Sequence, residues 1–305
     1  MAPRFPYPMP FGWFSVGRLD ELTEPVATVD AFGTQVVVWR DEAGTLHVFD
    51  PVCPHMGAHL GVGGEVVGNC LRCPFHFWEF DGDGANTLIP YADTINRKAR
   101  AYAYPTTIAN GHLLAWYHPD RSVAPTFEMP DRLGADLVFG GKFDRVVKAQ
   151  WQEIAENSVD MPHFHYVHGT GQINPVGKMT MDGPFRRVES QQAFNSSKGP
   201  ITGDLFSSSF GPGIGLIEFH LFATVTLISA ITPIDDDSVH VRFTFWHDGS
   251  DIGAKIAAPF AGEVARQFDQ DIPIWEAKSF LPVPALAPSE KPVTELRKWA
   301  AQFYA

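Results

Sequence analysis

Two short pairs of metal-ligating residues constrain the fold of this chain more than any other feature. One pair is Cys53-Pro-His55, the other is Cys73-Pro-Phe-His76, and 17 residues separate His55 from Cys73. Glycines are frequent over residues 57–84, which is typical of loops with demanding backbone geometry. Because each pair combines one thiol with one imidazole, the pattern predicts that two cysteines and two histidines share a metal centre.

A [2Fe–2S] cluster of the Rieske type has this donor set, since two cysteines hold one iron and two histidines hold the other. Neutral imidazoles in place of thiolates leave the cluster less negative, so it accepts electrons more readily. The alternative is a Cys₂His₂ zinc site, but zinc sites pair like residues, as Cys-x₂₋₄-Cys and His-x₃₋₅-His. The mixed pairs favour the cluster, with Cys53, His55, Cys73 and His76 as its ligands.

Two neighbouring residues resemble ligands without fitting the pattern. Cys70 forms a Cys-x-x-Cys with Cys73, which alone would suggest zinc or a redox pair, and we expect it to be a small buried side chain. His59 has no partner at ligand spacing, so we expect an ordinary loop histidine.

A second concentration of ligand-type residues lies over residues 156–169. Non-haem Fe(II) oxygenases use two histidines and one carboxylate, with positions left open for O₂. The candidates are His163 and His168, with His165 as a rival. A five-residue spacing does not align on an ideal α-helix, so a broken or π-bulged turn is expected. The alternative, ordinary polar residues near a helix end, loses weight because an electron-transfer cluster precedes them.

The carboxylate of such a site must come from elsewhere in the chain. The segment 266–275 offers Asp269 and Asp271, and Pro273 follows Asp271 closely, so the local helix geometry could turn the Asp271 side chain inward. Taken singly, each of these two aspartates is interpreted by default as a solvated acid on the surface of a helix. Spacing alone does not choose between the two.

The length of 305 residues predicts two domains, 1–120 and 121–305, divided near the polar, proline-containing stretch 119–134. Residues 31–39 and 45–49 are expected to form a hairpin, and 112–117 another strand. Further strands are expected over 214–234 and 239–247, with a turn at 235–238. The expected helices are 148–167, a long helix over 252–280 interrupted at Pro259 and Pro273, and one starting near Pro292.

Composition excludes several function classes. The 23 basic residues against 35 acidic ones give a net charge of −12, which argues against nucleic-acid and anionic-membrane binding. The longest apolar stretch, 221–231, is too short for a transmembrane segment, and the first residues lack a signal-peptide core.

Three cysteines do not suggest a disulfide scaffold, so a cytoplasmic protein is expected. Residues 211–215 lack the G-x-G-x-x-G spacing, so NAD(P)H is expected to act only through a partner.

The combination of C-x-H-x₁₇-C-x₂-H with N-x₂-D-x₂-H-x₄-H resembles the α subunits of Rieske non-haem iron oxygenases, over nearly the whole chain. Within that family the chain is most similar to 3-ketosteroid 9α-hydroxylase oxygenase components and related sterol-acting enzymes. The stretches that carry this similarity are residues 31–39, 88–92, 156–163, 271–275 and 287–292.

The resemblance implies an α+β fold: an N-terminal all-β Rieske domain, and a catalytic domain of the helix-grip, START-like type with helices flanking an antiparallel sheet. It implies that His163, His168 and Asp271 bind a mononuclear Fe(II). It also implies a head-to-tail homotrimer in which Asp160 links His163 to His76 of a neighbouring subunit. Asn157 would lie close to the iron without ligating it.

The resemblance further implies a terminal monooxygenase component that uses O₂ and electrons from an NAD(P)H-dependent reductase or ferredoxin. Its expected substrate is apolar and polycyclic, a steroid or sterol, and the aromatic segment 206–222 suits a large flat molecule or an ordinary sheet core equally. Sterol methyl-group oxidation (C-4 demethylation) and desaturation stay open, as do aromatic substrates. The chain is shorter than typical steroid hydroxylases of the group, so a different substrate mouth is expected.

An alternative of another class is a Rieske ferredoxin-like electron carrier, which binds partners without doing chemistry. The chain continues far beyond the cluster segment and carries a second ligand set, which speaks against this alternative.

Overall fold

The computed structural model describes residues 4–170, 173–196 and 199–305, without the side chains of 192–201. The chain forms two compact units, one of Ser15–Glu128 and one of Met1–Phe14 together with Met129–Ala305. The division at residue 128 lies inside the polar stretch 119–134. The sequence-based division places the first 14 residues in the N-terminal domain, whereas the structure groups them with the C-terminal unit.

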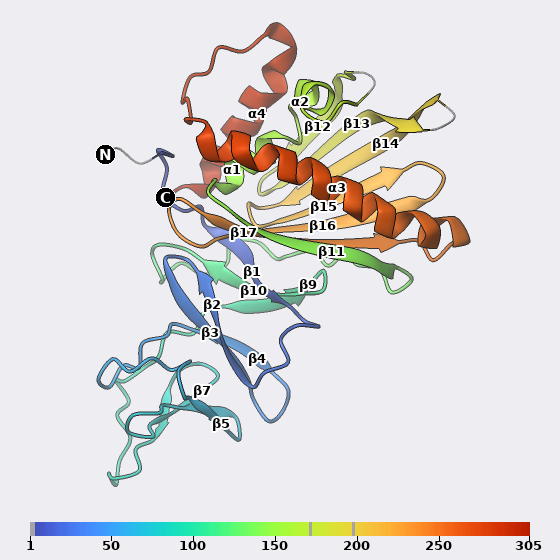
Figure 1. Cartoon of the computed structure of the whole chain (residues 1–305). Helices are drawn as coiled ribbons and strands as arrows, with labels where there is room; N and C mark the ends of the chain where they lie inside the picture. The colour runs from blue at the N-terminus through green and yellow to red at the C-terminus, as the bar shows by residue number, and fades with distance from the viewer. Residues whose placement is uncertain (1–3, 171–172, 197–198) are drawn as a thin grey trace. The chain divides into compact units, whose positions relative to one another are not determined.

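The Ser15–Glu128 unit consists of short strands and long loops (Figure 1). Its sheets have the strand orders β1-β10-β9, β2-β3-β4 and β5-β6-β7-β8. The strands are β1 (Gly12–Arg18), β2 (Val26–Ala31), β3 (Thr34–Arg40), β4 (Leu46–Phe49), β5 (Glu65–Val67), β6 (Cys70–Arg72), β7 (Glu79–Asp81), β8 (Asn86–Leu88), β9 (Thr106–Ala109) and β10 (His112–Tyr117).

The predicted strand over 31–39 is wrong at its beginning. Strand β2 ends at Ala31, which pairs with Thr34, so Phe32 and Gly33 form a two-residue hairpin turn. Both turn residues have positive φ, 58° and 75°, as a type I′ turn requires. Phenylalanine is unusual there, and its ring is buried and stacks on Tyr117 with 4.8 Å between centroids. The predicted pairing of the next two strands, β3 with β4, is confirmed.

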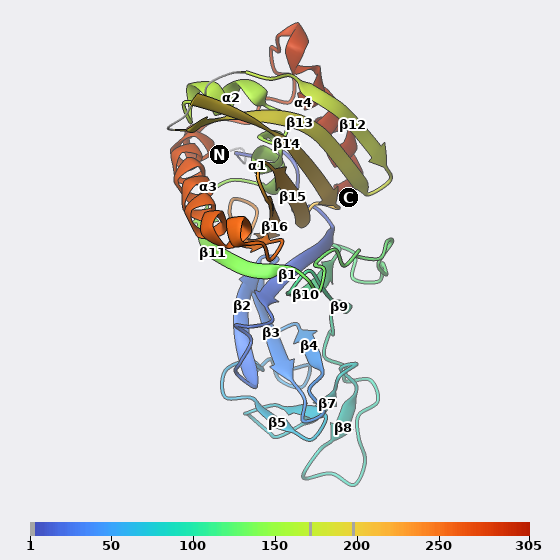
Figure 2. The ribbon, with the colours of Figure 1, turned by 90° about the vertical axis from the view of Figure 1, so that its right-hand side faces the viewer.

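The second unit is built on one curved antiparallel sheet of strand order β11-β17-β16-β15-β14-β13-β12. Figure 2 shows helix α3 on the concave side of this sheet. The strands are β11 (Val138–Val147), β12 (Val176–Asp182), β13 (Phe185–Ser196), β14 (Gly199–Phe210), β15 (Ile214–His220), β16 (Thr224–Pro233) and β17 (Val239–His247). The helices are α1 (Trp151–Glu156), α2 (Met161–Tyr166), α3 (Asp251–Ala277) and α4 (Lys291–Ala300), with 3₁₀ turns η1 (Pro288–Glu290) and η2 (Ala301–Phe303).

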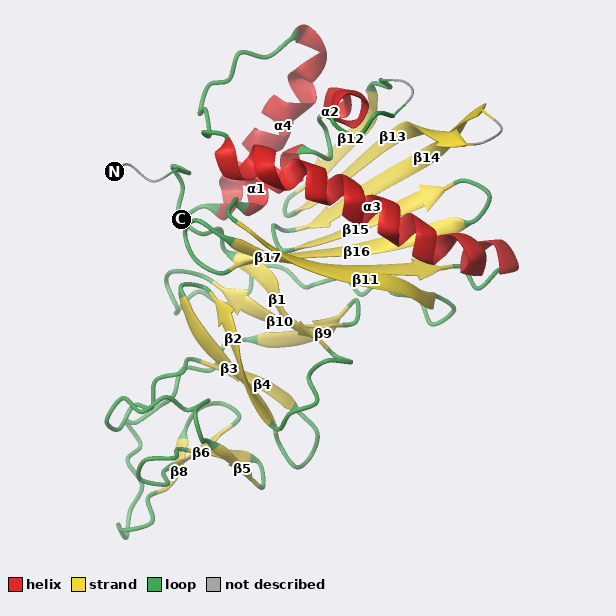
Figure 3. Ribbon diagram, in the orientation of Figure 1, coloured by secondary structure: helices red, strands yellow, loops and turns green. Residues whose placement is uncertain are grey.

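Three sequence-based expectations need correction in this unit (Figure 3). The stretch 214–234 forms two strands, β15 and β16, rather than one. The stretch 148–167 forms two short helices, because the chain leaves helical geometry between α1 and α2. Helix α3 is not interrupted at Pro259 or Pro273 but continues through both.

The continuity of α3 has a packing explanation. A proline inside a helix removes one hydrogen bond and costs roughly 3 kcal/mol. Most helical stability in proteins comes from the packing of an apolar face, and α3 buries Ala257, Ala261, Phe268 and Trp275 against the sheet. The helix near Pro292 is confirmed as α4, with proline in its first turn. No helix of the described residues is long and apolar enough to cross a membrane.

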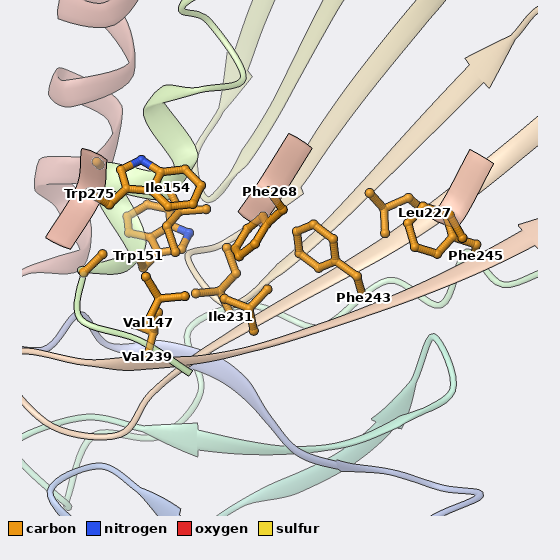
Figure 4. Packing of buried hydrophobic residues seen from close by; sticks show 14 of the residues in the cluster. Val147, Trp151, Ile154, Leu227, Ile231, Val239, Phe243, Phe245, Phe268 and Trp275 are labelled. Carbon is orange, nitrogen blue, oxygen red and sulfur yellow. The ribbon is translucent and has the colours of Figure 1, made fainter. Parts of the chain in front are cut away.

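The core of this unit lies between α3 and the sheet (Figure 4). Phe268 of α3 faces Phe243 of strand β17, and Trp275 of α3 lies beside Trp151 and Ile154 of α1. Residues three and four positions apart share one face of a helix, so a residue between Phe268 and Trp275 at that spacing also points into this unit. Asp271 holds that position and is buried accordingly.

Candidate metal centres and the cavity beside the second centre

The two Cys–His loops of the first unit share one backbone plan. In the first loop the N–H of Gly57 donates to the carbonyl of Cys53 at 2.9 Å. In the second loop the N–H of Phe77 donates to the carbonyl of Cys73 at 3.1 Å. The fourth residue after each cysteine is left-handed, with φ of 79° at Gly57 and 60° at Phe77. A bulky residue in this conformation is strained, so the surrounding structure must hold the second loop in shape.

The two thiols lie together in the interior of the unit. Cys53 is 1% and Cys73 2% exposed, and both are free. Burial, together with the neighbouring thiol of Cys73, raises the pKa of Cys53 to about 11. Two unoxidised thiols that contact each other in a buried site fit the pair of cysteines that hold one iron of a Rieske cluster.

The two imidazoles lie next to each other at the partly exposed side of the same loops. The rings of His55 and His76 are 4.7 Å apart between centroids, with planes at 71°. His55 stacks on Trp78 at 4.2 Å, and the indole N–H of Trp78 donates to the hydroxyl of Tyr91 at 2.8 Å. Nδ1 of His76 is buried and has no hydrogen-bond partner among the described residues. An unpaired ring nitrogen beside a second imidazole fits a histidine-held iron.

The two residues set aside in the sequence lie near these loops. Cys70 is half-buried and its Sγ lies 3.4 Å from the hydroxyl oxygen of Thr87, so the expectation that it is buried is wrong. Strand β6 begins at Cys70, and the alternation of exposure along this short strand places Leu71 rather than Cys70 in the core. His59 accepts a hydrogen bond from the N–H of Gly61 at Nδ1, as a loop histidine does.

The second centre brings together three residues from three places in the chain. His163 lies on α2, His168 lies just after the end of α2, and Asp271 lies on α3. One potential ligand atom of each lies within 4.8 Å of the others. The ring planes of the two histidines are at 83°, with centroids 5.1 Å apart. The five-residue spacing is accommodated because α2 ends at Tyr166 and the chain turns before His168.

Each histidine of this centre uses Nδ1 for a fixed hydrogen bond elsewhere. Nδ1 of His163 pairs with the backbone carbonyl of Asp160, and Nδ1 of His168 lies 3.0 Å from Oε1 of Gln270. This leaves Nε2 of each ring for a metal, and such partners fix the ring orientation of metal-binding histidines. Nε2 of His168 lies 3.4 Å from Oδ2 of Asp271.

The surroundings shift the pKa values of the two histidines in opposite directions. Burial lowers the pKa of His163, although the Asp160 carbonyl and the charge of Asp271 act against it. Burial would also lower the pKa of His168, but its contacts with Asp271 and Gln270 raise the pKa above its usual value. One carboxylate whose oxygen lies within 4.8 Å of two imidazole nitrogens is the donor set of a non-haem Fe(II) site.

Only one of the two candidate acids is part of this group. Asp269 is 48% exposed at its side chain and forms a two-pronged ion pair with Arg145, at 2.7 and 2.9 Å. Asp271 is buried and accepts a hydrogen bond from Nδ2 of Asn157 at 2.9 Å. His165 turns its Nδ1 to the carbonyl of Thr170 at 2.7 Å and is not in the group of three.

A cavity of about 220 Å³ lies beside the three residues, which form part of its wall. One water needs only about 10–15 Å³ of such space, so the cavity holds a substantial molecule. Most of the wall is apolar, including Ile217, Phe219, Leu227, Phe243 and Phe260. Strands β14 and β15 supply much of it, so the segment 206–222 contributes to a cavity as well as to the sheet.

Two residues of the site have no local signal in the sequence. Gln270 orients His168 from 102 residues away, and a glutamine between two aspartates carries no mark of that role. Arg186 lines the cavity from strand β13 while being almost fully buried. A lone arginine in a strand is ordinarily solvated, so only the fold reveals its position.

Comparison with known proteins gives the class. Residues 12–103 match the family model of the Rieske [2Fe–2S] domain, and residues 115–304 match that of the 3-ketosteroid 9α-hydroxylase C-terminal domain. The molecule is therefore a Rieske-type oxygenase, an oxidoreductase with a [2Fe–2S] cluster and a mononuclear iron that uses O₂. More narrowly, the chain belongs to the 3-ketosteroid 9α-hydroxylase family. The class excludes both the zinc interpretation of the first centre and the ferredoxin-like carrier.

Several curated relatives match almost the whole chain. The chain is 32% identical over 320 residues to a 3-ketosteroid-9-alpha-monooxygenase oxygenase component of Rhodococcus rhodochrous, covering 96% of this chain and 83% of the relative. It is 30% identical over 329 residues to the cholesterol 7-desaturase of Xenopus laevis, covering 97% and 72%.

Solved structures share the fold at lower identity. Dicamba monooxygenase bound to dicamba has a TM-score of 0.80 and 16% identity, covering 96% of both chains. NdmA of Pseudomonas putida CBB5 with caffeine has a TM-score of 0.77 and 19% identity, covering 95% of this chain and 89% of that one. The predicted α+β architecture, with a β Rieske domain and an antiparallel catalytic sheet, is confirmed.

Proposed function

We propose that this chain is the terminal oxygenase component of a Rieske monooxygenase system that hydroxylates an apolar polycyclic substrate, a steroid or sterol. The observation that carries the proposal is the position of His163, His168 and Asp271 in the wall of a largely apolar cavity. The curated relatives, which are named for a 3-ketosteroid and for cholesterol, support the substrate class.

We assign the metal ligands residue by residue. Cys53, His55, Cys73 and His76 hold the [2Fe–2S] cluster, and His163, His168 and Asp271 hold the mononuclear iron. When bound, these groups supply electron transfer and the activation of O₂ beside the substrate. The protein side chains orient the ligands: Asn157 holds Oδ2 of Asp271, and Gln270 holds His168. The apolar wall positions the substrate and excludes water.

The proposed assembly is a head-to-tail homotrimer. Asp160 is half-buried, and its carboxylate makes no hydrogen bond within the described parts of the chain, while its backbone carbonyl holds His163. This arrangement leaves the carboxylate available to His76 of a neighbouring subunit. We assign Asp160 the role of linking the two centres between subunits.

The electrons come from an NAD(P)H-dependent reductase or a ferredoxin. Exposed apolar side chains surround the paired imidazoles, which suits contact with another protein; these are Val52, Met56, Phe75 and Phe77. We also propose a cytoplasmic location, which the three free cysteines support, and functional domains of residues 1–120 and 121–305.

Desaturation at the same centre is the second candidate, because cholesterol 7-desaturases from several animals are among the relatives. One experiment separates the outcomes. The reduced, iron-loaded protein is mixed anaerobically with a panel of steroids and sterols, exposed to O₂, and its products are identified by mass. Gain of one oxygen supports hydroxylation, loss of two hydrogens supports desaturation, and an oxidised methyl group supports demethylation. Absence of any oxidised steroid from the whole panel contradicts the proposed substrate class.

A further inference from the structure

The cavity contains a buried positive charge that the proposed chemistry does not use. Arg186 lies on strand β13, lines the cavity and is only 3% exposed. Its Nη2 donates to the hydroxyl oxygens of Ser158 at 3.0 Å and Ser209 at 2.9 Å. Ser209 is the cross-strand partner of Arg186 on β14, and Ser158 directly follows Asn157. The side chain that carries the guanidinium is thus held at a fixed place, and it belongs to the same cavity wall as His163, His168 and Asp271.

This guanidinium has hydrogen-bonding capacity left over. Nε and Nη1 have no hydrogen-bond partner among the described residues. The guanidinium carbon lies 5.3 Å from the ring centroid of Trp299, a cation–π contact that offsets only part of the lost hydration. Burial lowers the pKa of Arg186 to about 10, so the group still carries its charge at neutral pH.

The acids in the cavity wall are engaged elsewhere. Glu263 forms an ion pair with Arg266 at 2.6 Å, and Asp271 is held by Asn157 at 2.9 Å and lies against His168. Neither pairs with Arg186, whose described partners are neutral serines and an aromatic ring. The cavity therefore has a positive charge without a counter-charge from the described residues.

A buried charge without a partner is unfavourable, and proteins compensate it by ion pairing. Water can satisfy free N–H groups but cannot supply a negative charge. An anionic group on a bound ligand supplies both, and a carboxylate forms strong charge-assisted hydrogen bonds with a guanidinium.

We propose that Arg186 binds a carboxylate carried by the polycyclic substrate, so that this enzyme acts on a steroid or sterol acid in preference to the neutral compound. The proposal rests on the proposed function, because it takes the cavity to be the substrate site. Arg186 is then the residue that determines specificity for the acid, and the apolar wall binds the ring system.

The chain offers a matched control in the next residue. Arg187 follows Arg186 on β13 and points to the opposite face of the sheet, since side chains alternate along a strand. Its side chain is 42% exposed and lies 3.6 Å from Glu218. Arg186→Met removes the charge and keeps most of the length, whereas Arg187→Met removes an exposed charge outside the cavity wall. Arg186→Lys retains a charge in a different geometry.

The test measures binding to the iron-loaded protein by anaerobic titration calorimetry. The ligands are 3-oxo-4-androstene-17β-carboxylic acid, its methyl ester and 4-androstene-3,17-dione. We expect the wild type and Arg187→Met to bind the acid at least about tenfold more tightly than the ester, as charge-assisted hydrogen bonds predict. We expect Arg186→Met to lose this preference through weaker binding of the acid, and Arg186→Lys to keep part of it.

The outcomes separate this proposal from the proposed function. Equal binding of acid and ester by the wild type overturns the role of Arg186 and leaves the steroid-binding cavity intact. Preference for the acid that persists in Arg186→Met also overturns it. Failure of the wild type to bind any of the three compounds overturns both proposals. The comparison of acid with ester in the wild type decides the matter even when an Arg186 variant does not fold.

Discussion

Asn157 donates a hydrogen bond from Nδ2 to Oδ2 of Asp271 at 2.9 Å, and the same oxygen lies 3.4 Å from Nε2 of His168. The carboxylate is therefore fixed by a neutral donor on one side and faces an imidazole on the other. Asp269, one half-turn earlier on α3, is instead paired with Arg145 at the surface. Two acids on one helix thus have different surroundings, and this difference can be tested directly.

We expect Asp271→Asn to lose the mononuclear iron while keeping the [2Fe–2S] cluster, because the amide removes the charged ligand and the cluster loops belong to the other unit. The matched control is Asp269→Asn, which breaks an exposed ion pair worth about 0–1 kcal/mol and should keep all the iron. Iron analysis and the spectrum of the reduced cluster measure both. Full iron content in Asp271→Asn would show that this residue is not a ligand.

Gln270→Leu should weaken iron binding at the second centre without abolishing it. The variant removes the acceptor that holds Nδ1 of His168, and loss of such an orienting partner costs roughly 10–100-fold in metal affinity. Gln270→Glu keeps an acceptor oxygen and should restore most of the affinity. The measurement is a competition titration with an iron chelator. Equal affinity in Gln270→Leu and the wild type would assign no orienting role to this glutamine.

The local patterns of the sequence predicted the parts of the site that depend on neighbours along the chain. The four residues that we propose as cluster ligands lie in two short loops, so their pairing is visible as spacing. The hairpin turn at Phe32 and Gly33 was missed, because a phenylalanine with positive φ depends on stacking with Tyr117, a distant residue. The continuity of α3 through Pro259 was missed for the same kind of reason, since packing on the sheet overrides a local helix breaker.

The choice between Asp269 and Asp271 required knowledge of which face of α3 is buried. Phe268 and Trp275 define that face once the helix is known to be continuous, and Asp271 lies on it. Spacing alone left both acids open, because a helix that is expected to break at Pro273 does not define a continuous buried face. Arg186 could not have been predicted, because its burial depends on Trp299, which lies far away in the chain, and on the pairing of β13 with β14.

Cys70 and Cys73 give a test of the first centre. Cys73→Ser should abolish the cluster, because the thiolate is an iron ligand in our assignment. Cys70→Ser should keep the cluster spectrum and change the free energy of unfolding by less than about 1 kcal/mol, because a half-exposed thiol is replaced by a slightly smaller hydroxyl. The low-field paramagnetic spectrum after dithionite reduction reports on both. Loss of this spectrum in Cys70→Ser, with the protein folded, would contradict the assignment.

The N-terminal segment is predicted to stabilise the second unit through one ion pair. Arg4 contacts both carboxylate oxygens of Glu153, at 2.9 and 2.6 Å, and the Glu153 side chain is fully buried. Arg4→Met leaves that carboxylate without its charge partner, so we expect the free energy of unfolding to fall by roughly 2–3 kcal/mol. Arg97→Met, which replaces an exposed arginine of the other unit, is a control for the general loss of a charge. Urea denaturation measures the free energy of unfolding. Equal values for the two variants would contradict a specific stabilising role of the Arg4–Glu153 ion pair.

Asp160→Asn tests whether the carboxylate transfers electrons between subunits or only shapes the loop. The backbone carbonyl of Asp160, which holds His163, is retained in the variant, so both metal centres should load normally. The amide cannot carry the charge that pairs with a histidine of a neighbouring subunit, so most of the turnover should be lost. Asp182→Asn, an exposed acid on β12, should turn over like the wild type. Iron analysis, steady-state product formation and the rate of iron reduction in rapid mixing give the answer. Slow reduction of a fully loaded second centre supports the link, whereas wild-type turnover at full iron content excludes it.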